Sequence, residues 1–130
     1  MLDRRFAQKG KEEMKNQEML KHVLGIIEKE KLSLFYEKYD NSYSNIQEGY
    51  YDAENKSIHI ASFHKNGVHE CLVIAHEIGH YFDVIERPDL SISEFDRENA
   101  ANNYMLKLAK SYDLENDAIK LAKYRMKDYK

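Results

Sequence analysis

The segment 71–82 constrains the fold most, because it places two histidines and a glutamate in an otherwise apolar stretch. It reads Cys-Leu-Val-Ile-Ala-His-Glu-Ile-Gly-His-Tyr-Phe, so His76 and His80 are four residues apart and Glu77 follows the first of them. On a helix this spacing puts both imidazoles on one face, one turn apart, where their nitrogens can converge on a metal ion. The alternative is an amphipathic helix with solvated or neighbour-bonded histidines. The apolar flanks disfavour that alternative, because buried imidazoles need partners.

Length and composition indicate one soluble globular domain over residues 1–130. Of the 130 residues, 42% are hydrophobic and 33% are charged, and the formal net charge is −3. This charge gives no electrostatic footprint for nucleic acid, and no apolar stretch is long enough to span a membrane. We therefore expect a cytoplasmic protein that binds neither. The single cysteine, Cys71, excludes an intramolecular disulfide and a thiolate zinc site, and we interpret it as a core thiol.

The spacing of apolar residues predicts an α+β fold. Helical spacing over about 12–29 predicts a first helix, preceded by eleven flexible residues. The period then changes to two, which predicts a small sheet of three short antiparallel strands near 32–36, 49–51 and 58–60. The last two strands are expected to form a hairpin.

Three helices are expected after the sheet. The helix that carries the histidine motif begins after Asn66-Gly67 and ends before Arg87-Pro88-Asp89, because proline disfavours a helical conformation in the residue before it. Ser91-Ile92-Ser93-Glu94 is a capping-box pattern that starts the next helix, with Phe95 in its buried stripe. Asp113 is expected to cap the last helix.

A third metal ligand has to come from another element, since a catalytic zinc ion commonly has three protein ligands and one open position. Asp83 and His69 are excluded, because they would stack along the same helix as the two histidines. The remaining candidates are His59, His64, Glu94, Asp96 and Glu98. Glu98 is favoured, because helix packing brings the start of its helix back under the motif and small residues follow it. Asn102, one turn later, either accepts a hydrogen bond from a ligating histidine or faces solvent.

The motif His76-Glu77-Ile78-Gly79-His80, followed after seventeen intervening residues by Glu98-Asn99-Ala100-Ala101-Asn102, resembles the ImmA/IrrE family of zinc metallopeptidases. The resemblance implies a minimal zincin-like domain with a gluzincin-like site. In such a site Zn²⁺ is held by His76, His80 and Glu98, and Glu77 is the catalytic base. It also implies a specific intracellular protein substrate, a transcriptional repressor of a mobile element or stress response. Met105 departs from the family pattern, which usually has alanine there.

The chemistry expected from this site is the hydrolysis of a peptide bond. The zinc ion would lower the pKa of its water toward about 7, and Glu77 would carry the proton to the leaving amine. An extended peptide could align beside the strand at 57–62. The alternative function is a non-catalytic zinc-binding regulatory or protein-interaction module, which would have no need of Glu77. The sequence indicates no particular oligomeric state.

Overall fold

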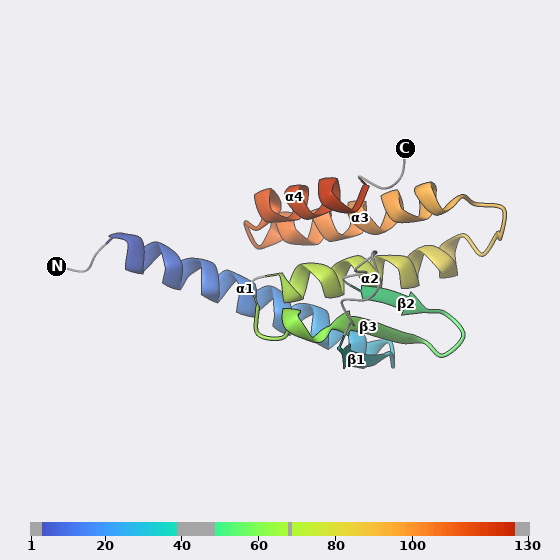
Figure 1. Cartoon of the computed structure of the whole chain (residues 1–130), viewed down its shortest axis with the longest axis horizontal. Helices are drawn as coiled ribbons and strands as arrows, with labels where there is room; N and C mark the ends of the chain where they lie inside the picture. The colour runs from blue at the N-terminus through green and yellow to red at the C-terminus, as the bar shows by residue number, and fades with distance from the viewer. Residues whose placement is uncertain (1–3, 39–48, 68, 127–130) are drawn as a thin grey trace.

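The fold is α+β, as predicted. A computed structural model describes residues 4–38, 49–67 and 69–126. The elements in chain order are α1 (Arg4–Lys29), β1 (Ser33–Glu37), β2 (Gly49–Asp52), β3 (Ser57–Ala61), the short 3₁₀ helix η1 (Ser62–His64), α2 (Glu70–Glu86), α3 (Glu94–Ser111) and α4 (Glu115–Met126). Figure 1 shows three layers, with α3 and α4 on one side of α2 and the sheet on the other.

Helix α2 is the centre of the molecule and carries the histidine motif. It contacts α1, α3, β2 and β3, and every residue from 71 to 79 is buried. Full burial of each large aliphatic side chain stabilises the fold by about 1.5–3 kcal/mol, and Leu72, Ile74 and Ile78 are all fully buried. The predicted buried motif helix is therefore confirmed.

The sheet is mixed, so the prediction of an antiparallel sheet is wrong for one strand pair. Strands β2 and β3 form the predicted antiparallel hairpin, but β1 pairs with β3 in parallel, giving the order β1-β3-β2. A short turn can only reverse the chain, which makes the hairpin antiparallel. Strand β1 pairs with β3, and both run antiparallel to β2, so two reversals of the chain leave β1 and β3 parallel. Alternation of apolar residues reports which face of a strand is buried and carries no information about its direction.

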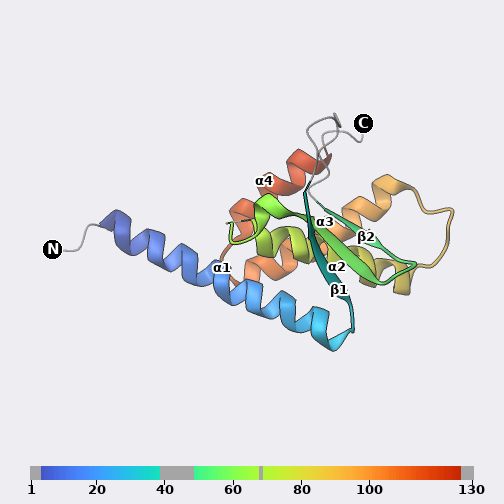
Figure 2. The same ribbon diagram turned by 60° about the horizontal axis from the view of Figure 1, so that its bottom comes forward.

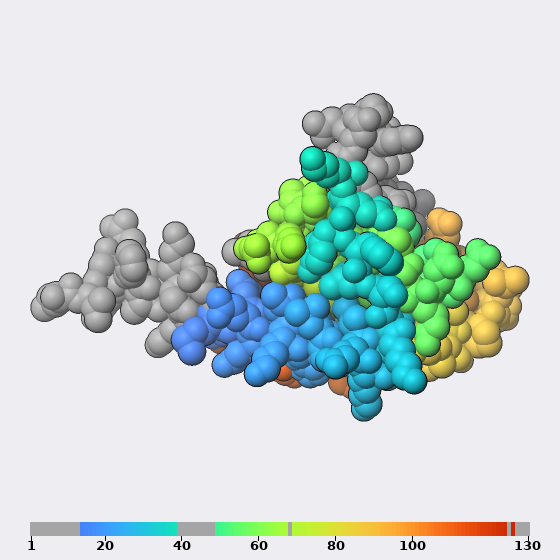
Figure 3. Space-filling view, turned by 90° about the horizontal axis from the view of Figure 1, so that it is seen from below, coloured from blue at the N-terminus to red at the C-terminus, as the bar shows by residue number. Residues whose placement is uncertain are grey.

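Helix α1 packs along α2 and begins at Arg4, earlier than the expected residue 12. Most of the stretch that we expected to be flexible thus lies in the helix, and residues 1–3 are outside the described part. The helix ends at Lys29 as expected. Lys31 adopts a left-handed φ of 57°, and the Leu32 N–H donates to the Ile27 carbonyl at 2.9 Å, which closes the last turn. Figure 3, which views the molecule from the sheet side, shows α1 and β1 next to each other.

The start of α3 lies later than the capping-box pattern indicated. Ser93 is the N-cap, and its hydroxyl accepts a hydrogen bond from the Asp96 N–H at 3.1 Å. Ser91 instead belongs to the preceding turn, where its N–H donates to the Asp89 carboxylate at 2.9 Å. Phe95, in the first turn of this helix, is 46% exposed and does not join the buried stripe, so that prediction is wrong.

Asp113 lies in the turn that closes the C-terminal end of α3, and it does not cap α4. It adopts a left-handed φ of 61°, and the following Leu114 N–H donates to the Ala109 carbonyl at 2.9 Å. The Asp113 carboxylate pairs with Lys15 on α1 at 2.8 Å. The residue therefore connects the C-terminal end of α3 to the first helix, which the sequence pattern did not indicate.

Candidate metal centre

Three side chains from two helices meet at one point between α2 and α3. The Nε2 atom of His76 lies 2.7 Å from one carboxylate oxygen of Glu98, and the Nε2 atom of His80 lies 3.1 Å from the other. One ligand atom from each residue lies within 4.8 Å of the others. The three residues that the sequence analysis selected as metal ligands are thus brought together, and the cluster could hold a metal ion.

The two histidines come from successive turns of α2, as their spacing required. Their ring centroids are 4.9 Å apart and the rings are nearly perpendicular, at 82°. Both imidazoles present Nε2 to the same carboxylate across the helix interface. A divalent ion can replace the protons that these nitrogens share with the carboxylate, because it binds the neutral imidazole and the ionised carboxylate.

Close contact between α2 and α3 brings Glu98 within reach of the histidines. A Cβ atom added at Gly79 would lie only 2.9 Å from the Cα atom of Ala101 and 3.0 Å from the Cβ atom of Tyr104. Ala101 itself is fully buried. The small residue after Glu98 was part of the prediction, but the role of Gly79 was not recognised. A glycine inside a helix is a signal for such a close approach.

The cluster is enclosed on one side and reaches solvent on the other. His76 is fully buried and the Glu98 side chain is 11% exposed, whereas the His80 side chain is 20% exposed. Burial alone would raise the pKa of Glu98. Hydrogen bonds and positive charge from the two histidines outweigh this effect and hold the pKa of the carboxyl well below its usual range. The carboxylate is therefore ionised and suited to bind a cation.

Glu77 lies beside the cluster without belonging to it. Its carboxylate oxygen is 3.8 Å from the Nε2 atom of His76, and only 1% of the residue is exposed. The start of β2 covers it, since a Cβ atom added at Gly49 would lie 3.5 Å from the Cγ atom of Glu77. The predicted catalytic residue thus lies next to His76 of the cluster and is shielded from water.

The other ligand candidates lie outside the cluster. His59 is on β3, where its ring stacks between Phe35 and Tyr50 and its nitrogens contact Glu37 and, at 2.8 Å, the Ser57 hydroxyl. His64 is buried in η1. Glu94 and Asp96 are exposed in the first turn of α3.

Asp83 and His69 are likewise outside the cluster, as predicted. The Asp83 carboxylate is paired with two arginines, Arg87 at 2.6 Å and Arg97 at 2.9 Å. His69 is the residue that precedes α2. Neither residue belongs to the group of His76, His80 and Glu98 whose ligand atoms lie close together.

Asn102 is buried, with 4% of the residue exposed, so the solvent-facing alternative is wrong. Neither of its amide atoms has a hydrogen-bond partner among the described residues, and the predicted bond to a ligating histidine is not formed. Burying an amide without partners costs free energy, so Asn102 is a destabilising feature of α3.

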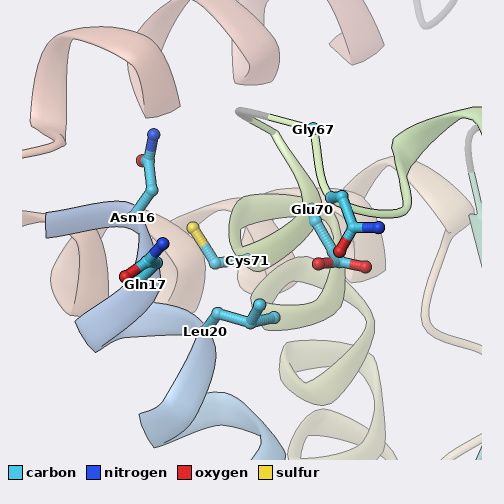
Figure 4. Close-up of a pocket in the computed structure, with 7 residues that line it drawn as sticks. Asn16, Gln17, Leu20, Gly67, Glu70 and Cys71 are labelled. Atoms are coloured by element: carbon cyan, nitrogen blue, oxygen red, sulfur yellow. The ribbon is translucent and has the colours of Figure 1, made fainter. Parts of the chain in front are cut away.

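A separate hollow of about 270 Å³ lies between α1 and the start of α2 (Figure 4). It is lined by Asn16, Gln17, Leu20, Asn66, Gly67, Glu70 and Cys71. None of the three clustered ligands is among these residues. Burial raises the pKa of the Cys71 thiol to about 12, so it is protonated and unreactive at neutral pH, as expected of a core thiol.

Two further observations are not specific to the cluster. No helix in the described part is both long and apolar enough to cross a membrane. Comparison of the chain with models of protein families, with characterised proteins and with solved structures finds no match. The resemblance to the ImmA/IrrE family therefore stays a prediction that rests on the motif residues and their spacing.

Proposed function

We propose that this protein is a zinc-dependent endopeptidase. The observation that carries the proposal is the convergence of His76, His80 and Glu98 on one point, with Glu77 beside it. Two imidazoles and one carboxylate are a common ligand set of catalytic zinc, and three protein ligands leave a fourth position open. Zn²⁺ bound there would supply Lewis acidity to a water molecule and to the scissile carbonyl.

Glu77 is proposed as the general base. Its carboxylate lies at the edge of the cluster, where it can take the proton of the attacking water and pass it to the leaving amine. Its burial keeps other waters away from this proton transfer. A purely structural metal site has no need of a carboxylate at this place. Glu77 therefore favours a peptidase over the alternative, a non-catalytic zinc-binding regulatory module.

The edge of β2 is proposed to align the substrate. The expected strand, at 57–62, cannot do so, because β3 is central and pairs with β1 on one side and β2 on the other. Within the described part of the chain β2 pairs only with β3, and it begins at Gly49, next to Glu77. An extended peptide that adds to this edge would pass over the catalytic base and the cluster.

The substrate is proposed to be a specific protein of the cytoplasm. The resemblance to the ImmA/IrrE family supports a transcriptional repressor of a mobile element or stress response. The acidic net charge of −3 and the lack of a recognition motif favour protein over nucleic acid as the direct partner.

The test is the metal content of the purified protein beside three variants. We expect about one zinc per chain in the wild type, little in Glu98→Ala, and full zinc in Glu77→Gln, which keeps the ligands. Glu115→Ala is the matched control, because it removes an exposed carboxylate from the first turn of α4, outside the cluster. Iron and manganese should be measured in the same samples, since this ligand set also suits other metals.

Cleavage is measured on a fluorogenic peptide mixture with the same four proteins. Wild type and Glu115→Ala are expected to cleave, and Glu98→Ala and Glu77→Gln are not. Full zinc in Glu98→Ala would refute the ligand assignment. Zinc-dependent cleavage that persists in Glu77→Gln would refute the assignment of the general base.

A further inference from the structure

The corner between α2 and α3 concentrates the negative charge of the chain. Residues 83–97 contain five of the 23 acidic residues and two of the 20 basic residues, so the rest of the chain is balanced at 18 of each. The segment therefore accounts for the whole formal net charge of −3. Its connecting residues project past the ends of the helices in both ribbon views (Figures 1 and 2).

The two arginines of this segment are engaged inside the corner. The Arg87 Nε atom donates to Asp83 at 2.7 Å, and Arg97 donates to the other oxygen of the same carboxylate at 2.9 Å. Both guanidinium groups thus neutralise a buried acid. The exposed carboxylates of Glu86, Glu94 and Asp96 form no ion pair within the residues that the structure describes.

Large apolar side chains are exposed among these acids. Leu90 is 97% exposed, Ile85 58% and Phe95 46%. Single exposed apolar residues are common on protein surfaces. Here, however, three occur within eleven residues at one corner of the fold, among carboxylates.

Leu90 is held in a fixed turn. On one side of it, the Asp89 carboxylate accepts the Ser91 N–H at 2.9 Å. The Asp89 carbonyl accepts Arg97 at 2.7 Å and the Ile92 N–H at 3.3 Å. Because Arg97 is itself anchored on Asp83, the turn is tied to α2. Because the backbone on either side of Leu90 is already ordered, a partner that binds this side chain does not have to order the turn, which lowers the entropy cost of binding.

We propose that this corner, defined by Ile85, Glu86, Leu90, Glu94, Phe95 and Asp96, docks a protein partner whose segment presents apolar side chains flanked by lysine or arginine. The apolar residues would supply contact area, and the carboxylates would select and steer a basic segment. This docking role rests on the proposed peptidase function, because the docked partner would be the substrate protein. Phe95 lies one turn before the metal ligand Glu98, so a docked partner would be close to the cluster.

The test is fluorescence anisotropy of a labelled amphipathic peptide with leucine and lysine at helical spacing, added to the full chain. A peptide with glutamate in place of lysine is the matched probe. We expect Leu90→Ser to weaken binding of the lysine peptide by about tenfold. Glu94→Lys is expected to weaken it several-fold and to reduce its salt dependence. The control variants Leu24→Ser and Glu115→Lys, at exposed positions on α1 and in the first turn of α4, should bind as the wild type does.

Three results would overturn the proposal. The first is equal binding of the glutamate peptide. The second is an equal loss in Glu94→Lys and Glu115→Lys, which would indicate diffuse charge attraction. The third is a wild-type dimer, seen by sedimentation, that Leu90→Ser dissociates, because the corner would then contact a second copy. Binding needs neither metal nor catalysis, so its failure would leave the zinc content and the proposed function untouched.

Discussion

Gly79→Ala tests whether close helix contact builds the metal centre. The added Cβ atom would lie 2.9 Å from the Ala101 Cα atom and 3.0 Å from its carbonyl oxygen and the Tyr104 Cβ atom. Carbon atoms in contact are usually about 3.5–4.0 Å apart, so the helices must separate by roughly 0.5–1 Å. Such overpacking costs about 1–3 kcal/mol, whereas the higher helix propensity of alanine returns about 1 kcal/mol. We expect a net loss of up to about 2 kcal/mol in the free energy of unfolding.

The larger effect is expected on metal binding. Glu98 moves with α3, and a displacement of this size exceeds the tolerance of about 0.2 Å in metal–ligand distances. We expect zinc affinity to fall by at least about tenfold, measured by competition with a chromophoric chelator, while urea denaturation reports the stability.

Gly25→Ala is the matched control for this variant. Gly25 is also a helical glycine, but nothing lies within 4 Å of the Cβ position that the substitution would fill. It should stabilise the protein by about 0.5–1 kcal/mol and leave zinc affinity unchanged. If Gly79→Ala kept the zinc affinity of the wild type, the inference that this contact positions Glu98 would be wrong.

Three further predictions concern stability and reactivity. Burial would raise the pKa of Asp83, but Arg87 and Arg97 outweigh this effect and hold the pKa below its usual value. The ionised Asp83 carboxylate therefore stabilises the folded state fully above about pH 4, and this stabilisation is lost as the pH falls through the folded-state pKa. Asp83→Asn should cost roughly 2–3 kcal/mol at neutral pH and flatten the acid limb of a pH–stability curve, and an unchanged limb would contradict this. Cys71 should react with a thiol reagent only as fast as the protein opens, so prompt labelling in native buffer would disprove its burial. Zinc at one hundred times its dissociation constant should add about 2.7 kcal/mol, which a chelator removes, and calorimetry with and without metal checks it.

The candidate site was largely predictable from the sequence, because its main constraint is local. The spacing of His76 and His80 alone puts both rings on one helix face, and the apolar flanks indicate that the helix is buried. The choice of Glu98 needed one further step, that consecutive helices pack against each other. Asn102 shows the limit of this reasoning: spacing left open whether it bonds a histidine or faces solvent, and the structure shows neither. Its hydrogen bonding depends on side-chain positions that spacing does not report.

The predictions that were wrong concern features that depend on contacts between segments far apart in the chain. The direction of β1 relative to its neighbour depends on which strand it pairs with, here β3, and the apolar alternation of 32–36 would be the same in either direction. Phe95 was placed in the core because its helical spacing matches the buried stripe of α3, but it lies in the first turn of that helix and is 46% exposed. Asp113 looked like an N-cap, but the left-handed conformation that ends α3 uses its backbone and an ion pair with Lys15 uses its side chain.

By itself, the sequence determined the helix that carries His76, Glu77 and His80, its burial and the residue types that can bind a metal, because these depend on period and composition. Only the tertiary structure decided how near Glu98 comes, through the contact of Gly79 with Ala101. It alone also decided that the strand edge beside Glu77 is that of β2. Both depend on distances between segments far apart in the chain, which local pattern does not encode.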